Sequence, residues 1–95
     1  MNPSKTDRAT TRVLTDLPNV GPSIASDLRQ VGIQVPIDLI GKDPFVLYKS
    51  LNEVTGVRHD PCVLDIFMSV IDYMAGNDAK PWWAYTETRK RILRE

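Results

Sequence analysis

The clearest pattern of apolar and polar positions lies in the second half of the chain. Apolar residues recur there at the spacing of one helix face, namely at Val63, Ile66, Phe67, Val70, Ile71 and Met74. The opposite face carries Asp65, Ser69 and Asp72. Asp60 and Pro61 provide a strong helix start, and Gly76 provides a stop. We therefore predict a helix from Pro61 to about Ala75 and place it at the centre of the core.

A second helical stripe occurs nearer the N-terminus. Its apolar residues are Ile24, Ala25, Leu28 and Val31. Pro22 suits the first helical position, where its missing N–H would be unpaired anyway, and Gly32 suits the position after the last turn. The pattern predicts a helix over 22–31. It also predicts a tight turn just before this helix, in which Asn19 and Gly21 adopt backbone angles that other residues avoid.

The next stretch repeats this arrangement in a weaker form. Pro36 and Gly41 delimit a helical segment of a turn or two over 35–40. Asp43 then provides an N-cap for a helix over 44–55, which ends at a glycine. The residues expected on the inner side of this helix are Leu47, Leu51 and Val54. We interpret the short helix, tight link and longer helix as a degenerate second copy of the first turn and helix, packed against it.

The start of the chain shows a less regular pattern. A helix from about Lys5 to Thr15 is expected to form the first arm of the turn that precedes the 22–31 helix. No segment shows the sustained alternation of a strand. The predicted fold is therefore all-α, a compact bundle of about five helices in a single domain over 1–95. Residues 1–5 and 90–95 are expected to fray.

The composition agrees with one small globular domain. The chain has 95 residues, of which 42% are hydrophobic and 25% are charged, enough for a modest core without metal or disulfides. Its single cysteine cannot form an internal disulfide. No apolar run approaches the ~20 residues of a membrane helix, and no signal-peptide pattern opens the chain. We therefore expect a cytoplasmic protein without a membrane partner.

Charge is unevenly distributed, although the formal net charge is zero at pH 7. Residues 1–12 and 79–95 are net basic, whereas residues 13–78 are net acidic. This field would repel DNA unless the fold brings the basic ends beside the turn over 17–24.

The run LPNVGPSIASDLRQVGI, at 17–33, resembles the helix-hairpin-helix motif of many DNA-associated proteins. The runs GVRHDPCVLD and KPWW narrow the resemblance to small bacterial proteins of the pathogenicity-locus family, some of which are named mitomycin-resistance proteins. The resemblance covers roughly Arg12 to Tyr85. It implies tandem helix-hairpin-helix units of the SAM-like type and a link to DNA damage or drug resistance. Asn19 stands where the motif usually has its first glycine, and Ser23 where DNA-binding versions commonly have a lysine.

A glycine turn that leads into a helix leaves backbone N–H groups able to bind an anion such as a phosphate. The candidate nucleic-acid contacts are Asn19, Val20, Gly21, Ser23 and Ile24, with Arg12 and Arg29 adding positive charge. Such main-chain donors would bind the DNA backbone weakly and would not read base sequence. In the alternative interpretation, the turn only packs two helices and the protein is a protein-interaction or dimerisation module. Both a monomer and a homodimer are compatible with the sequence.

A third interpretation centres on Cys62, in the first turn of the helix over 61–75. The positive end of the helix dipole and a protonated His59 would lower the pKa of this thiol and make it reactive. Alternatively, Asp60 caps the helix, Cys62 packs as a small apolar residue and His59 lies at the surface. One cysteine and one histidine fall short of the four ligands of a structural zinc site, so we expect no metal and no cofactor.

The last candidate combines aromatic and basic residues near the C-terminus. Trp82, Trp83 and Tyr85 precede a short basic helix or frayed end over 86–94, whose basic residues begin at Arg89. The aromatic rings either stack on bases or bury against the core and fix the C-terminus. The basic side chains would contact phosphates if this segment folds back near the turn. The chain shows no close carboxylate pair, phosphate loop or Ser-His-Asp combination, so we expect no catalytic residues and no enzymatic activity.

Overall fold

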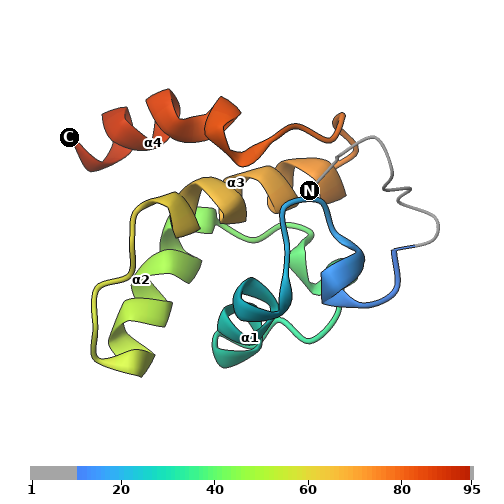
Figure 1. The fold of residues 1–95 in the computed structure, drawn as a ribbon, viewed down its shortest axis with the longest axis horizontal. Helices are drawn as coiled ribbons and strands as arrows, with labels where there is room; N and C mark the ends of the chain where they lie inside the picture. The colour runs from blue at the N-terminus through green and yellow to red at the C-terminus, as the bar shows by residue number, and fades with distance from the viewer. Residues whose placement is uncertain (1–10, 95) are drawn as a thin grey trace.

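The computed structural model describes residues 11–94, which are all-α as predicted (Figure 1). Its α-helices are α1 (Pro22–Gln30), α2 (Pro44–Thr55), α3 (Cys62–Met74) and α4 (Thr86–Leu93). Three short 3-10 helices accompany them: η3 (Leu14–Asp16), η4 (Pro36–Leu39) and η5 (Trp82–Tyr85). The described part of the chain contains no strand. Helix α3 crosses the middle of the molecule, with α1 and α2 on one side and α4 on the other (Figure 1).

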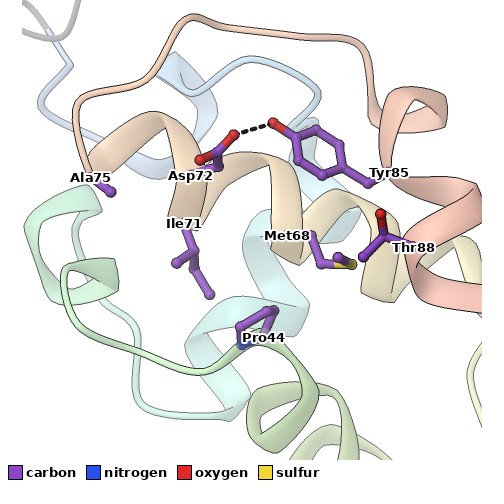
Figure 2. A pocket seen from close by; sticks show the side chains of 7 residues that line it. All are labelled: Pro44, Met68, Ile71, Asp72, Ala75, Tyr85 and Thr88. Carbon is purple, nitrogen blue, oxygen red and sulfur yellow. Dashed lines mark hydrogen bonds between the residues drawn. The ribbon is translucent and has the colours of Figure 1, made fainter. Parts of the chain in front are cut away.

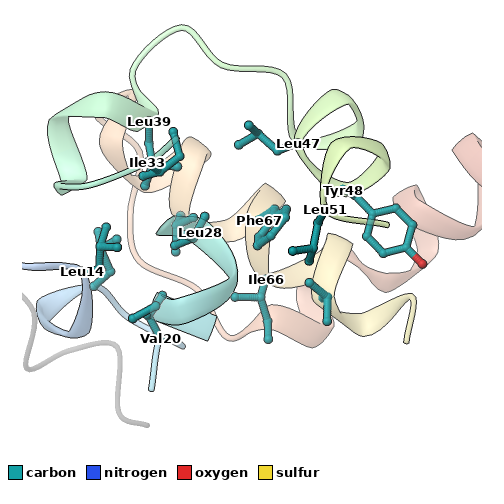
Figure 3. Packing of buried hydrophobic residues seen from close by; sticks show 14 of the residues in the cluster. Leu14, Val20, Leu28, Ile33, Leu39, Leu47, Tyr48, Leu51, Ile66 and Phe67 are labelled. Atoms are coloured by element: carbon teal, nitrogen blue, oxygen red, sulfur yellow. The ribbon is translucent and has the colours of Figure 1, made fainter. Parts of the chain in front are cut away.

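Helix α3 is the centre of the core, as its periodicity predicts. Its buried apolar residues are Val63, Leu64, Ile66, Phe67, Val70 and Tyr73. Phe67 is fully buried and points between Leu28 of α1 and Leu51 of α2 (Figure 3). Truncating such a phenylalanine to alanine costs about 3–5 kcal/mol of stability, because transfer and cavity terms add. This one helix therefore organises the packing of both N-terminal helices.

The polar face of α3 is covered by the C-terminal segment. Asp65 is fully buried, and its carboxylate accepts hydrogen bonds from Arg89 Nε at 2.9 Å and from Thr86 Oγ1 at 2.8 Å. Asp72 accepts a hydrogen bond from the Tyr85 hydroxyl at 2.6 Å. These polar residues dock η5 and α4 onto α3, so the face opposite the apolar stripe is a second packing face.

Helix α1 ends as its glycine predicts. Gly32 has a left-handed φ of 90°. The N–H of Ile33 donates to Leu28 O at 3.0 Å, and the N–H of Gly32 donates to Arg29 O at 3.1 Å, the two hydrogen bonds of a Schellman motif. Ile33 and Leu28 are both buried, so the same motif also carries an apolar contact into the core.

The predicted helix over 5–15 is wrong where it falls on described residues, and its residues 5–10 lie outside them. Residues 11–13 are not helical, and only the 3-10 helix η3 follows. The cause is local, because the Asp16 carboxylate accepts the backbone N–H groups of Arg12 at 2.9 Å and of Val13 at 3.0 Å. Side-chain to backbone hydrogen bonds of this kind compete with helix formation.

The same local structure recurs after α1. The Asp38 carboxylate accepts the N–H groups of Gln34 at 3.0 Å and of Val35 at 3.2 Å, and the 3-10 helix η4 follows. A left-handed residue comes next in both copies, Asn19 with φ 69° and Gly41 with φ 79°. Each copy then continues through a helix N-cap and a first-turn proline into α1 or α2. We call residues 12–30 the first turn unit and residues 34–55 the second turn unit.

The predicted inner face of α2 needs one correction. Leu47 and Leu51 are buried, but Val54 is 61% exposed. Tyr48 is buried in its place, and its hydroxyl donates to His59 O at 2.6 Å. The core side of α2 is therefore turned toward the link that connects it to α3. As to membranes, the helices seen between residues 11 and 94 are too short or too polar to cross one.

Candidate nucleic-acid interface

The N-terminus of α1 has no side-chain cap. Its N-cap is Gly21, and Pro22 at the first helical position has no N–H. The next N–H groups, of Ser23 and Ile24, have no acceptor among residues 11–94, whereas the N–H of Ala25 donates to Gly21 O at 3.0 Å. Ser23 is exposed. Two donors without an acceptor in the described part of the chain therefore lie at the positive end of the helix dipole, beside the exposed Ser23.

Gly21 does not use the conformational freedom that the sequence suggests. Its backbone is extended, with φ −98° and ψ −174°, and a Cβ atom placed on it would meet nothing within 4 Å. The left-handed residue of this turn is Asn19. What glycine contributes here is the lack of a capping side chain, so the N–H groups behind it stay open.

Asn19 and Val20 hold the turn in place. They are less exposed than Ser23. The Asn19 Nδ2 donates to Lys80 O at 2.8 Å and to Ser69 Oγ at 3.2 Å. Val20 is fully buried, and its N–H donates to Leu17 O at 3.3 Å. The turn is thus fastened to α3 and to the loop before η5.

Lys80 is a candidate that sequence reasoning missed. Its carbonyl is the acceptor for Asn19, so its exposed side chain starts beside the turn. Its ammonium stands on a flexible four-carbon stem. Lys80 thus comes to the turn from a distant part of the chain. No local sequence signal could have found it.

The two arginines predicted to help are both exposed but lie apart. Arg29 sits in the last turn of α1, about 10 Å along the axis from Pro22 at 1.5 Å per residue. Arg12 lies at the start of the first turn unit, next to the Asp16 carboxylate. The hydrogen bonds from Val13 and Arg12 lower the pKa of Asp16, which keeps it negatively charged there. The charge around the turn is therefore mixed.

The basic C-terminal residues do not converge on the turn. Arg89 is buried in its ion pair with Asp65. Helix α4, which also carries Lys90 and Arg91, lies across α3 from α1 (Figure 1). The contribution expected from this segment to a phosphate site at Gly21 is therefore absent in the described fold.

The two tryptophans before α4 separate into different environments. Trp82 is half-buried and packs against the core, whereas Trp83 is 63% exposed. Their rings meet edge to face, with centroids 5.7 Å apart and an interplanar angle of 83°. Trp82 therefore anchors the C-terminal segment, as one of the two interpretations expects.

The environment of Cys62 is opposite to that of a reactive thiol. Burial raises its pKa to about 11, helped by the hydrogen bond and charge of Asp60. The lowered pKa expected from the helix dipole and His59 is therefore wrong, and the thiol stays protonated at neutral pH. His59 is held elsewhere, with its Nδ1 2.9 Å from Asn52 Oδ1. Among the residues described, none cluster in a way that could hold a metal ion.

Comparisons with known proteins find a family model and a similar protein. The family model described as "Cdd1: Pathogenicity locus" matches residues 7–91. The "Mitomycin resistance protein McrB" of Streptomyces lavendulae is 45% identical over 80 residues, which cover 84% of this chain and 76% of that protein. No solved structure matches the chain. This chain belongs to the pathogenicity-locus family.

Proposed function

We propose that this protein is a non-catalytic accessory module that binds the DNA backbone weakly through the open N-terminus of α1. The observation that carries this proposal is the uncapped first turn, where the N–H groups of Ser23 and Ile24 lack an acceptor among the described residues. A phosphate oxygen placed there would accept both hydrogen bonds and would sit on the positive end of the helix dipole.

Lys80 supplies the electrostatic part of this site. Its backbone is fixed beside the turn by Asn19, so its ammonium can pair with the same phosphate or with the next one. One or two neutralised phosphates give a log–log salt dependence with a slope of about −1 to −2. The nearby Asp16 carboxylate opposes DNA, which is a reason to expect weak binding. The site contains main-chain donors and one flexible cation, so it would not read bases.

The relative supports a biological setting for this module. A protein that is 45% identical over 80 residues carries the name mitomycin resistance protein, which supports a link of this chain to drug resistance. A module that touches the DNA backbone fits a role beside damaged DNA, where other components would carry out the chemistry. We propose no catalytic role for any residue.

A short labelled DNA duplex, titrated by fluorescence anisotropy at low and moderate salt, tests this function. Gly21→Asp places a carboxylate where the phosphate would bind, and neither its backbone angles nor its space forbid the new side chain. We expect affinity to fall about tenfold or more, the worth of one charge-assisted hydrogen bond. Ser26→Asp adds the same charge at an exposed position further along α1 and is the matched control. Equal affinity for wild type and Gly21→Asp would overturn the proposal.

A second candidate function rests on the second turn unit. Several apolar side chains there are exposed, among them Ile37 by 66%, Ile40 by 54% and Val46 by 55%. A surface of this kind favours a protein-interaction or dimerisation role. Sedimentation or light scattering of wild type and Ile37→Lys tests it. A dimer that the variant dissociates would support it, and a monomer at all concentrations would exclude dimerisation through this surface.

A further inference from the structure

An open pocket of about 390 Å³ lies where α2, α3 and the C-terminal segment meet (Figure 2). It is distinct from the open end of α1, because its walls come from α3, from the start of α2 and from the segment around α4. The lining residues are Pro44, Met68, Ile71, Asp72, Ala75, Tyr85 and Thr88. Its volume falls within the range of small-molecule sites, about 300–1,000 Å³.

Most of the lining is apolar. Met68 and Ile71 of α3 are half-buried and form one wall, and Pro44 faces them from α2 (Figure 2). An unbranched methionine adapts to the shape of different ligands and makes favourable contacts with aromatic rings. This surface suits a flat apolar group.

A carboxylate lies at one end of the pocket (Figure 2). Asp72 Oδ2 accepts the Tyr85 hydroxyl at 2.6 Å, and Asp72 Oδ1 accepts Asn77 Nδ2 at 2.6 Å. Burial and this hydrogen bond raise the pKa of Tyr85, so its hydroxyl stays protonated as a donor. Both partners of the carboxylate are therefore neutral.

Asp72 lacks a cationic partner within residues 11–94, where the ion pair that forms joins Arg89 to Asp65. A half-buried negative charge beside an apolar surface is stabilised most by a cation. Each carboxylate oxygen can accept more than one hydrogen bond, so Asp72 keeps acceptor capacity after binding Tyr85 and Asn77. Thr88 adds a hydroxyl on the other side of the opening (Figure 2).

We propose that this pocket binds a small organic cation, an arylalkylamine or an aromatic amidine. Its charged nitrogen would pair with Asp72, and its flat apolar body would lie against Met68, Ile71 and Pro44. The Asp72 charge would repel anions, so DNA phosphates would not compete for this site. The inference does not depend on the proposed contact with DNA.

Three probes that share one ring system separate charge from shape. They are 2-naphthylmethylamine, 2-naphthalenemethanol and 2-naphthoate, titrated into the ¹⁵N-labelled full chain and followed by ¹H–¹⁵N NMR. We expect the amine to shift the amides of Met68, Ile71 and Thr88 saturably. Its affinity should exceed that of the alcohol about tenfold, and the carboxylate should not bind. Equal affinities for amine and alcohol, or shifts away from the pocket, would overturn the proposal.

Asp72→Asn tests the role of the charge. Its amide oxygen can still accept from Asn77, and its NH2 group can donate to the Tyr85 hydroxyl oxygen once that hydroxyl turns. The amine should then bind no better than the alcohol. Asp78→Asn removes the same charge from an exposed loop position and should leave the amine's affinity unchanged. Tyr85→Phe keeps the carboxylate and removes one neutral donor. We expect it to retain the preference for the amine, and loss of that preference in a folded Tyr85→Phe would count against a charge-based site.

Discussion

The two turn units of this protein begin their helices in different ways. In the second unit, Asp43 caps α2, and its Oδ1 accepts the N–H groups of Phe45 at 2.8 Å and of Val46 at 3.3 Å. In the first unit, Gly21 stands at the same position and α1 has no side-chain cap. The second unit therefore carries its own anion, while the first leaves the equivalent donors open to an anion from outside.

The residues around the two helix starts also differ in polarity. Ser23 and Thr15 of the first unit are exposed polar residues. The structurally equivalent residues of the second unit are Phe45 and Ile37, which are exposed and apolar. A polar surface with open donors suits a hydrated phosphate backbone, whereas a capped helix start with apolar neighbours suits a protein partner. The two proposed functions therefore rest on different units of one repeated structure.

The largest expected effect is on the free energy of unfolding, through a buried leucine that both units have at the same position. Leu17 and Leu39 follow the two 3-10 aspartates at equivalent positions, and both are fully buried. We expect Leu17→Ala and Leu39→Ala each to lower the free energy of unfolding by about 2–5 kcal/mol, measured by urea denaturation. The exposed Ile37→Ala is the control and should change stability by less than about 0.5 kcal/mol. A small loss at only one leucine would show that the two units do not contribute equally to the core.

A reciprocal exchange of the N-cap residues addresses the functional difference. Gly21→Asp closes the first unit, and Asp43→Gly opens the second. Each exchange should change stability by only a few tenths of a kcal/mol, so binding can be compared between folded proteins. We expect the double variant to recover part of the DNA binding that Gly21→Asp loses in anisotropy titrations, because Lys42 lies beside the newly opened helix. No recovery would show that the open N–H groups need Lys80 as well.

The sequence predicted those parts of the molecule whose signals are local. Asp43 with Pro44 and Gly56 bounded α2 to the residue, because caps and stops act within one turn. The sequence did not predict the long-range partners. Asp65 looks like an ordinary outer residue of α3, and only the folded chain brings Arg89 and Thr86 onto it.

The candidate site also combines features that follow from neighbouring residues with features that depend on long-range contacts. The turn into α1 and the donors of Ser23 and Ile24 follow from neighbouring residues, and so could be predicted from the sequence. Lys80 reaches the turn through a hydrogen bond from Asn19, a residue far away in the chain. Cys62 is half-buried, and the burial that raises its pKa, against the thiol interpretation, likewise depends on tertiary packing.

A smaller difference in stability is expected between substitutions at the two residues with left-handed backbone angles, Asn19 and Gly41. Gly41→Ala and Asn19→Ala both place a Cβ-bearing residue poorly suited to positive φ, at a cost of about 1–2 kcal/mol. Asn19→Ala also removes the hydrogen bonds to Lys80 and Ser69, so it should cost about 1 kcal/mol more in urea denaturation. Asn19→Gly removes the same hydrogen bonds but also relieves the strain of the positive φ, so its stability compares the two effects. If Asn19→Gly is as stable as wild type or more so, the hydrogen bonds to Lys80 and Ser69 contribute no more than the relieved strain.

The smallest expected effect is on how steeply the free energy of unfolding falls at acid pH. Backbone hydrogen bonds lower the pKa of Asp16 in the first unit and of Asp38 in the second. A carboxyl whose pKa is lower in the folded than in the unfolded chain stabilises the fold above its unfolded pKa of about 3.9, and this stabilisation is lost as pH falls through the folded pKa. Asp16→Asn and Asp38→Asn should therefore each make stability fall less steeply below about pH 4 in urea denaturation followed by circular dichroism. Because both aspartates bind two N–H groups in the same way, the two variants should flatten the curve equally. If only one variant does so, the two units differ in their 3-10 segments as well as in their caps, and the difference between them begins before the helix.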